Sequence, residues 1–208
     1  MMAFFTHCSA KSNRLPVWLA LALCALFATG QPLHAAEGVG VQFAEIRAAN
    51  EGYELAAQFV INPSRILEEA LEKGVALHFI AELEVMRPRS WWLNESVGEA
   101  SRRMRIYYNF LLRRYVIDSG YTTLTATTLD EALALLGRVE HWQILERGAL
   151  KPGQRYEARL RFKMDASQLA KPLQMGALAS GKWDLQSGWY EWKFDAPMPV
   201  KPAPRPVD

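Results

Sequence analysis

The chain has 208 residues, of which 50% are hydrophobic, and 24 basic side chains stand against 22 acidic ones. A formal net charge of +2 gives no indication of nucleic acid or of any other charged substrate. Both cysteines and part of the basic charge lie in the N-terminal residues, so conclusions about disulfide bonds and charge depend on whether that segment is removed.

Residues 1–36 have the pattern of a secretory signal peptide. Lys11 and Arg14 precede an apolar run of twelve residues, 17–28, and no acidic residue is present. This run is shorter than the ~20 residues that a membrane-spanning helix needs, and small residues ending at Ala36 are typical of a cleavage site. We therefore expect cleavage after Ala36 and a periplasmic location, with an uncleaved membrane anchor as the alternative.

Cleavage would change the composition of the chain that remains. The signal carries two of the 24 basic residues, none of the 22 acidic ones and both cysteines, Cys8 and Cys24, so 22 residues of each charge remain. The mature chain is then neutral and free of thiols, which excludes disulfide bonds and thiol redox chemistry. A domain of about 170 residues can be held by its core alone, because it buries roughly 70% of its unfolded surface.

Alternating apolar and polar residues predict a mainly β fold. The period of two is typical of a half-buried strand, and it is clearest over 53–61, 75–85 and 156–164. Further strands are predicted over 39–47, 103–110, 114–117, 139–146 and 189–194. The sequence Asn-Glu-Gly at 50–52 predicts a hairpin turn between the first two strands. We expect antiparallel, sandwich-like sheets with short capped helices at the junctions.

Three short helices are predicted between these strands. Asn62-Pro63 provides a cap and a first-turn proline for a helix over 64–73. A capping box at 128–131 opens a second helix, which a glycine closes. Residues 165–168 start a third helix of about one turn, which we expect to end before Pro172.

An internal similarity predicts two related β-rich halves, 37–118 and 119–196. Residues 53–66 and 156–169 each read as an alternating strand that runs directly into a capped helix, with four identities at a constant offset. The alternative is that junctions between a strand and a helix cap simply look alike. The predicted organisation is a signal peptide over 1–36, a β-rich domain over 37–196 and a proline-rich disordered tail over 197–208.

His78, Glu82 and Glu84 are the candidate metal ligands of the mature chain. They share the polar face of one predicted strand, where alternate residues lie close enough to hold one ion. Because one imidazole and two carboxylates are not a typical ligand set, we predict no metal and interpret this face as a solvated or edge-strand face. His141, beside Trp142, is interpreted as a boundary residue.

Catalytic motifs do not appear in the sequence. It holds no nucleophile elbow, no glycine-rich phosphate loop and no His-Glu-x-x-His, and we expect no cofactor. A pair of acidic residues for glycoside chemistry needs no fixed spacing. A hydrolase whose acidic residues converge only in the fold therefore stays an alternative.

The most unusual segment, 87–115, interleaves arginines with aromatic rings and contains only two acidic residues, Glu95 and Glu99. The binding residues that it predicts are Arg87, Arg89, Trp91, Trp92, Arg102, Arg103, Arg105, Tyr107, Arg113, Arg114 and Tyr115. Such a pattern suits an anionic or planar partner: lipid headgroups, a polyanionic glycan or an acidic protein face, and not nucleic acid in an exported protein. The alternative is cross-strand packing of arginine stems over rings.

With these residues in view, the chain resembles the bacterial family DUF4390, whose members are often labelled proline-rich signal peptide proteins. The resemblance covers nearly the whole mature chain and rests on 69–79, the Arg-Pro-Arg-Ser-Trp-Trp block at 87–92, 107–115, 169–173 and 183–189. It departs at Ala170, where the family's turn would read Leu-Pro-Lys-Pro. The resemblance implies an exported protein of Gram-negative bacteria with no assigned activity, often encoded beside an envelope-spanning sensor kinase.

We therefore expect a periplasmic, non-catalytic binding or accessory module for an envelope component such as a sensor kinase. No transmembrane span is expected in the mature chain. An envelope hydrolase and a purely structural envelope protein are the alternatives.

Overall fold

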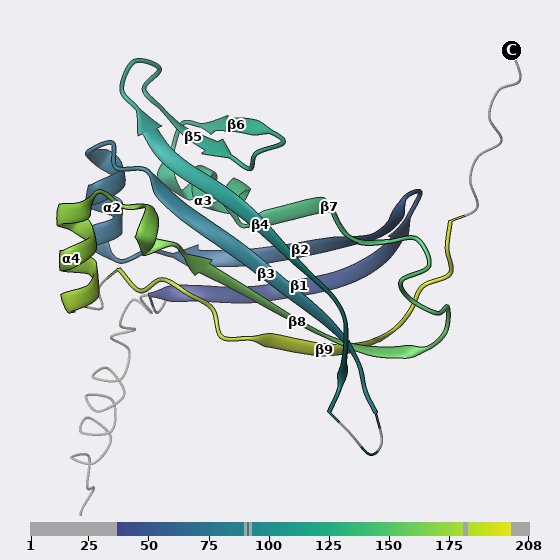
Figure 1. The fold of residues 1–208 in the computed structure, drawn as a ribbon. Helices are drawn as coiled ribbons and strands as arrows, with labels where there is room; N and C mark the ends of the chain where they lie inside the picture. Colours follow the sequence, from purple (N-terminus) through teal and green to yellow (C-terminus); the bar gives the residue numbers. More distant parts are fainter. Residues whose placement is uncertain (1–36, 90, 92, 181–182, 201–208) are drawn as a thin grey trace, which may run out of the picture. The chain divides into compact units, whose positions relative to one another are not determined.

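The computed structural model describes residues 37–89, 91, 93–180 and 183–200 (Figure 1). The predicted signal peptide with its cleavage site, Trp92 and the end of the proline-rich segment lie outside the described residues. Where that segment is described, from Pro197 to Val200, it forms neither helix nor strand.

The strands of the described residues pair in two antiparallel sheets. The smaller sheet has the order β1 (Gly38–Ala49), β2 (Gly52–Asn62) and β7 (Arg138–Glu146). The larger sheet has the order β6 (Thr123–Ala126), β5 (Arg114–Asp118), β4 (Glu95–Asn109), β3 (Leu77–Arg87), β8 (Arg155–Met164) and β9 (Tyr190–Asp195). The predicted mainly β fold of antiparallel sheets is confirmed.

One hydrophobic core joins the two sheets. The inward residues of β2, β3 and β8 alternate with exposed or half-buried ones, as a period of two requires. At the centre, the ring of Phe162 in β8 lies 4.6 Å from that of Phe59 in β2 and 5.3 Å from that of Phe79 in β3. Because Phe59 belongs to the smaller sheet, these rings pack one sheet against the other.

The predicted helix boundaries are largely confirmed for three of the four helices in the described residues. These are α2 (Arg65–Glu72), α3 (Leu129–Leu136) and the single turn η1 (Ala166–Gln168). The cap of α2 is Ser64 and not Asn62. Thr128 caps α3 as predicted, since its hydroxyl accepts a 3.2 Å hydrogen bond from the Glu131 amide.

Three elements differ from the sequence prediction. The predicted third helix ends before Pro172, as η1 does, but α4 (Lys171–Ser180) was not predicted. Proline is tolerated in its first turn, where the missing N–H would be unpaired anyway. β4 begins eight residues before the predicted 103, and β6 was not predicted. Both regions are rich in small and polar residues and show no clear apolar alternation.

The strand pairing does not follow the two predicted halves. β7, from the second half, pairs with β2, while β8 pairs with β3 from the first. β2 is the central strand of the smaller sheet, whereas β8 lies between β3 and β9 in the larger one. The two similar segments therefore occupy unlike places in different sheets, which argues against related halves and for a common strand-to-cap junction.

Within the described ranges, no helix has the length and apolar composition needed to cross a membrane.

Candidate functional site

The predicted binding residues lie along β4 and its two hairpins and do not form one surface. β4 runs the length of the larger sheet, so the β3–β4 and β4–β5 hairpins lie at its opposite ends (Figure 1). Between them, Arg102 is in register with the buried Ala81 and Arg103 with Ile80, so the two arginines point to opposite faces. The segment therefore divides into three sites, which we take in turn.

At the β3–β4 hairpin the arginines are already engaged. Arg87 and Arg89 both donate to the carboxylate of Glu95, the latter at 2.5 Å. Hydrogen bonds from Arg89 and then Arg87 hold the pKa of Glu95 below its ordinary value. Among the described residues of this hairpin, Trp91 and Leu93 are the large apolar side chains that are exposed, Trp91 with 96% of its surface accessible.

In the middle of β4, on the outer face of the larger sheet, an arginine packs over an aromatic ring, which agrees with the alternative interpretation of this segment. The guanidinium of Arg105 lies 5.1 Å from the ring centroid of Tyr107 and donates to Asp118 at 3.0 Å. A residue held in this way by its own sheet is less available to a partner.

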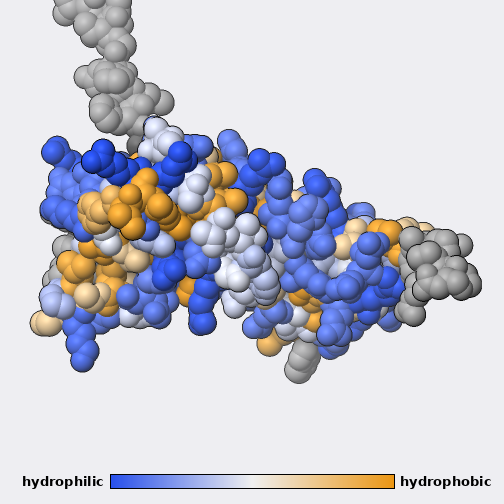
Figure 2. Space-filling model, turned by 90° about the horizontal axis from the view of Figure 1, so that it is seen from above, coloured by the Kyte–Doolittle hydropathy of each residue, from blue (hydrophilic) through white to orange (hydrophobic). Residues whose placement is uncertain are grey.

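The β4–β5 hairpin ends in a run of exposed apolar residues. The exposed fractions of Phe110, Leu111 and Leu112 are 62%, 92% and 56%. Arg113 and Arg114 follow and are also exposed. Figure 2, the view from above, shows hydrophobic residues gathered towards the end of the molecule where Figure 1 places this hairpin and α2. Below, the five residues 110–114 are called the β4–β5 loop.

The β4–β5 loop has a fixed conformation. The side-chain oxygen of Asn109 accepts hydrogen bonds from the amides of Leu111 and Leu112, both at 3.0 Å. Arg113 closes the turn with a φ of 51°, which is uncommon for a non-glycine residue. These hydrogen bonds define the backbone of the turn that carries the apolar side chains.

Aromatic packing fixes the base of the same loop. The ring of Tyr108 makes edge contacts with Phe110 at 5.3 Å and with Tyr115 at 5.0 Å. Phe110 also lies over Gly74, where a Cβ atom would come within 2.6 Å of the ring. Tyr115 is buried, and its pKa is raised first by that burial and then by Glu72. Tyr115 thus supports the loop and does not present its ring to a partner.

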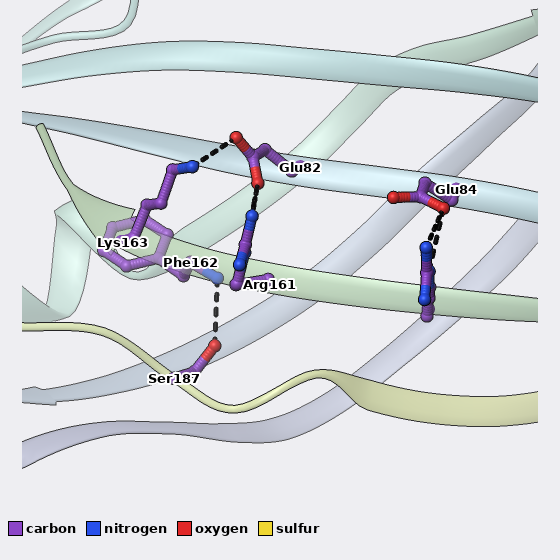
Figure 3. Close-up of polar contacts among 7 residues, drawn as sticks. Glu82, Glu84, Arg161, Phe162, Lys163 and Ser187 are labelled. Carbon is purple, nitrogen blue, oxygen red and sulfur yellow. Dashed lines mark hydrogen bonds and ion pairs between the residues drawn. The ribbon is translucent and has the colours of Figure 1, made fainter.

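The three candidate metal ligands do not assemble as a site. Figure 3 shows Glu82 and Glu84 of β3 pointing towards β8, where Glu82 accepts from Arg161 at 2.5 Å and from Lys163 at 2.7 Å. Glu84 accepts from Arg159 at 2.5 Å. The described residues hold no group of three His, Cys, Asp or Glu side chains that could bind a metal ion.

The interpretation of this face as an edge strand was wrong. β3 lies between β4 and β8, and the face is covered by ion pairs from its neighbours and by Trp189, whose ring lies under the guanidinium of Arg161 at 4.4 Å. Beside them His78 has a buried Nδ1 atom with no hydrogen-bond partner among the described residues. Burial, and then Arg105, lower the pKa of His78, which favours the neutral form of its imidazole.

Acid is expected to weaken the fold through Glu82. Burial alone would raise the pKa of this carboxyl, but hydrogen bonds from Lys163 and Arg161 outweigh burial and hold it below the ordinary value of 4.5. A carboxyl with a lowered folded-state pKa stabilises the fold above its unfolded pKa and loses that contribution as the pH falls through the folded value. We expect the free energy of unfolding to decrease as the pH is lowered below 4.5.

Urea unfolding at a series of pH values measures this effect. In Glu82→Gln, stability at pH 7 should be lower and its decrease in acid shallower than in the wild type, because the titrating group is gone. An equal decrease in both proteins would assign the acid sensitivity to other carboxyls.

Sequence reasoning missed a second region, at a bulge of the smaller sheet. Leu55 is in register with Trp142 and Ala57 with Val139, so β7 carries one extra residue here. His141 takes a φ of 50°, and its Nδ1 atom lies 3.0 Å from Glu54. The histidine is exposed and does not lie at the boundary of the core as the sequence suggested. Nothing in the sequence marks the bulge, because the bulge depends on how two distant strands pair.

Comparison with known proteins identifies one family. The family model described as "Domain of unknown function (DUF4390)" matches residues 36–193. No curated protein and no solved structure was found to match the chain.

Proposed function

Because this chain belongs to the DUF4390 family, to which no activity is assigned, we propose from its geometry that it is an exported, non-catalytic binding module of the bacterial envelope. The observation that carries the proposal is the β4–β5 loop, which presents three apolar side chains and two arginines on a fixed turn. The pattern of a signal peptide at residues 1–36 supports export to the periplasm.

The chemistry of the β4–β5 loop selects a protein partner with an apolar groove and an acidic rim. A fixed loop loses little conformational entropy on binding, so contacts of Leu111 and Leu112 would contribute directly to affinity. Arg113 and Arg114 suit carboxylates at the rim of such a groove. We propose the extracytoplasmic domain of a sensor kinase as this partner, because the family resemblance implies that class.

Two variants test the loop. We expect Leu111→Asp combined with Leu112→Asp to weaken attachment roughly tenfold or more, because it would bury two unpaired carboxylates in an apolar groove. Met198→Asp is the matched control, since Met198 is equally apolar, 77% exposed and outside the loop. Crosslinking in living cells from the exposed position 114, which the double variant leaves unchanged, followed by cell fractionation and identification of the adducts, measures attachment and export together.

The outcomes separate the alternatives. Discrete adducts with an envelope protein that disappear in the double variant support the proposal. Binding of the purified protein to phosphatidylglycerol vesicles, lost in the same variant, would assign the loop to a lipid surface instead. Equal crosslinking of wild type and double variant, or recovery of the protein in the cytoplasm, would overturn the proposal.

A further inference from the structure

Arg102 is a charged residue on the inner face of β4. Its neighbours on this face of the strand are Ala100, Met104 and Ile106, and the last two are buried. Arg105 and Arg159, on the outer face of the same sheet, each meet a carboxylate. Arg102 has no such partner among the described residues, so its position on the inner face needs a separate explanation.

The hydrogen bonds of Arg102 are incomplete. Its Nη1 atom donates to the carbonyl of Glu140 at 3.4 Å and its Nη2 atom to the hydroxyl of Ser119 at 3.3 Å, both long contacts. Its Nε atom is buried and has no partner. Among the described residues no carboxylate forms an ion pair with it, and burial lowers the pKa of the guanidinium.

A cavity lies directly against this guanidinium, where β7 and α3 meet the strands β4 to β6. Its volume is about 360 Å³, near the lower end of the range of about 300–1,000 Å³ for small-molecule sites. About half of the wall is apolar, from Met104, Ile117, Leu124, Leu135 and Leu136, and the other half is polar or charged. Two charged residues at the cavity, Arg138 and Glu140, neutralise each other at 2.8 Å.

We propose that this cavity binds a small amphipathic anion, a single-chain carboxylate whose head pairs with Arg102 and whose apolar chain lies against the leucines of α3 and β6. The charge balance of the lining selects an anion, because Arg102 is the cation that remains after Arg138 and Glu140 have paired. A half-buried charge without a counterion is costly, and a carboxylate would supply the missing partner through charge-assisted hydrogen bonds. The proposal does not depend on the function of the β4–β5 loop.

Calorimetric titration of the purified protein with decanoate, below its micellar concentration, tests the site. We expect one site per chain and binding roughly tenfold to a hundredfold weaker in Arg102→Met, because a hydrogen bond to a charged group is lost. Arg103→Met is the matched control. It removes the same charge from the next residue of β4, which points to the opposite face, and it should bind decanoate as the wild type does.

Two further measurements keep the proposal falsifiable if Arg102→Met fails to fold. The wild type should bind decanol at least about tenfold more weakly than decanoate, since the alcohol carries no charge for Arg102. Leu124→Trp, on the edge strand β6, should block binding by filling the cavity. No binding by the wild type, equal binding of decanoate and decanol, or equal losses in Arg102→Met and Arg103→Met would each overturn the proposal.

Discussion

Phe162→Ala is expected to destabilise the protein by about 3–5 kcal/mol, as removal of a large buried aromatic ring does. Phe162 has no accessible surface, and its ring contacts Phe59 in the smaller sheet and Phe79 in the larger one. The substitution would therefore leave a cavity at the place where the sheets meet. Against a total stability of about 5–15 kcal/mol for a domain of this kind, the loss is large.

Urea unfolding at pH 7 measures this loss, and Phe43→Ala is its control. Phe43 is 47% exposed on the edge strand β1, so its truncation should cost less than about 1 kcal/mol. Because both sheets share one core, we expect a single cooperative transition in each protein. Equal losses in the two variants, or separate transitions of the two sheets, would contradict a core shared through Phe162.

The strands that define this core were predictable from local pattern. Where one face of a strand is buried along its whole length, every second residue is apolar, as from Tyr53 to Ile61 in β2 and from Tyr156 to Met164 in β8. The pattern is absent where burial is shallow. Three of the four residues of β6 are exposed, and the first half of β4 alternates small and polar residues. Neither segment has the apolar alternation that would have predicted a strand.

The candidate sites were less predictable, because they depend on pairing. The sequence predicted one binding surface from the arginines and aromatic rings of 87–115, because they are neighbours in the chain. In the structure, residues 102 and 103 face opposite sides of the sheet. A local signal for this existed: Arg102, Met104 and Ile106 share one alternation, and the last two are apolar. Glu82 pairs with both Arg161 and Lys163, whereas Arg102 pairs with no carboxylate of the described residues. Both outcomes depend on register between strands far apart in the chain.

The turn between β1 and β2 shows how closely a local prediction can depend on a distant strand. Asn-Glu-Gly at 50–52 predicted the hairpin, and the structure confirms it, with Ala49 in register with Gly52. Gly52 has a φ of 151°, and it also lies against β7, where a Cβ atom would come within 2.1 Å of the carbonyl oxygen of Leu145. The glycine is therefore required twice, for its backbone conformation and for the approach of a second strand.

Gly52→Ala is accordingly expected to cost about 3 kcal/mol or more, from backbone strain together with a contact that backbone atoms cannot relieve. Gly38→Ala is the matched control. Gly38 has a similar φ of 142°, but a Cβ atom at this position would meet no heavy atom within 4 Å, so Gly38→Ala carries the strain alone and should cost about 1 kcal/mol. Thermal and urea unfolding of both variants measure the difference. If the two losses were equal, strain at the turn would account for all of it, and the pairing of β2 with β7 at this end would contribute nothing.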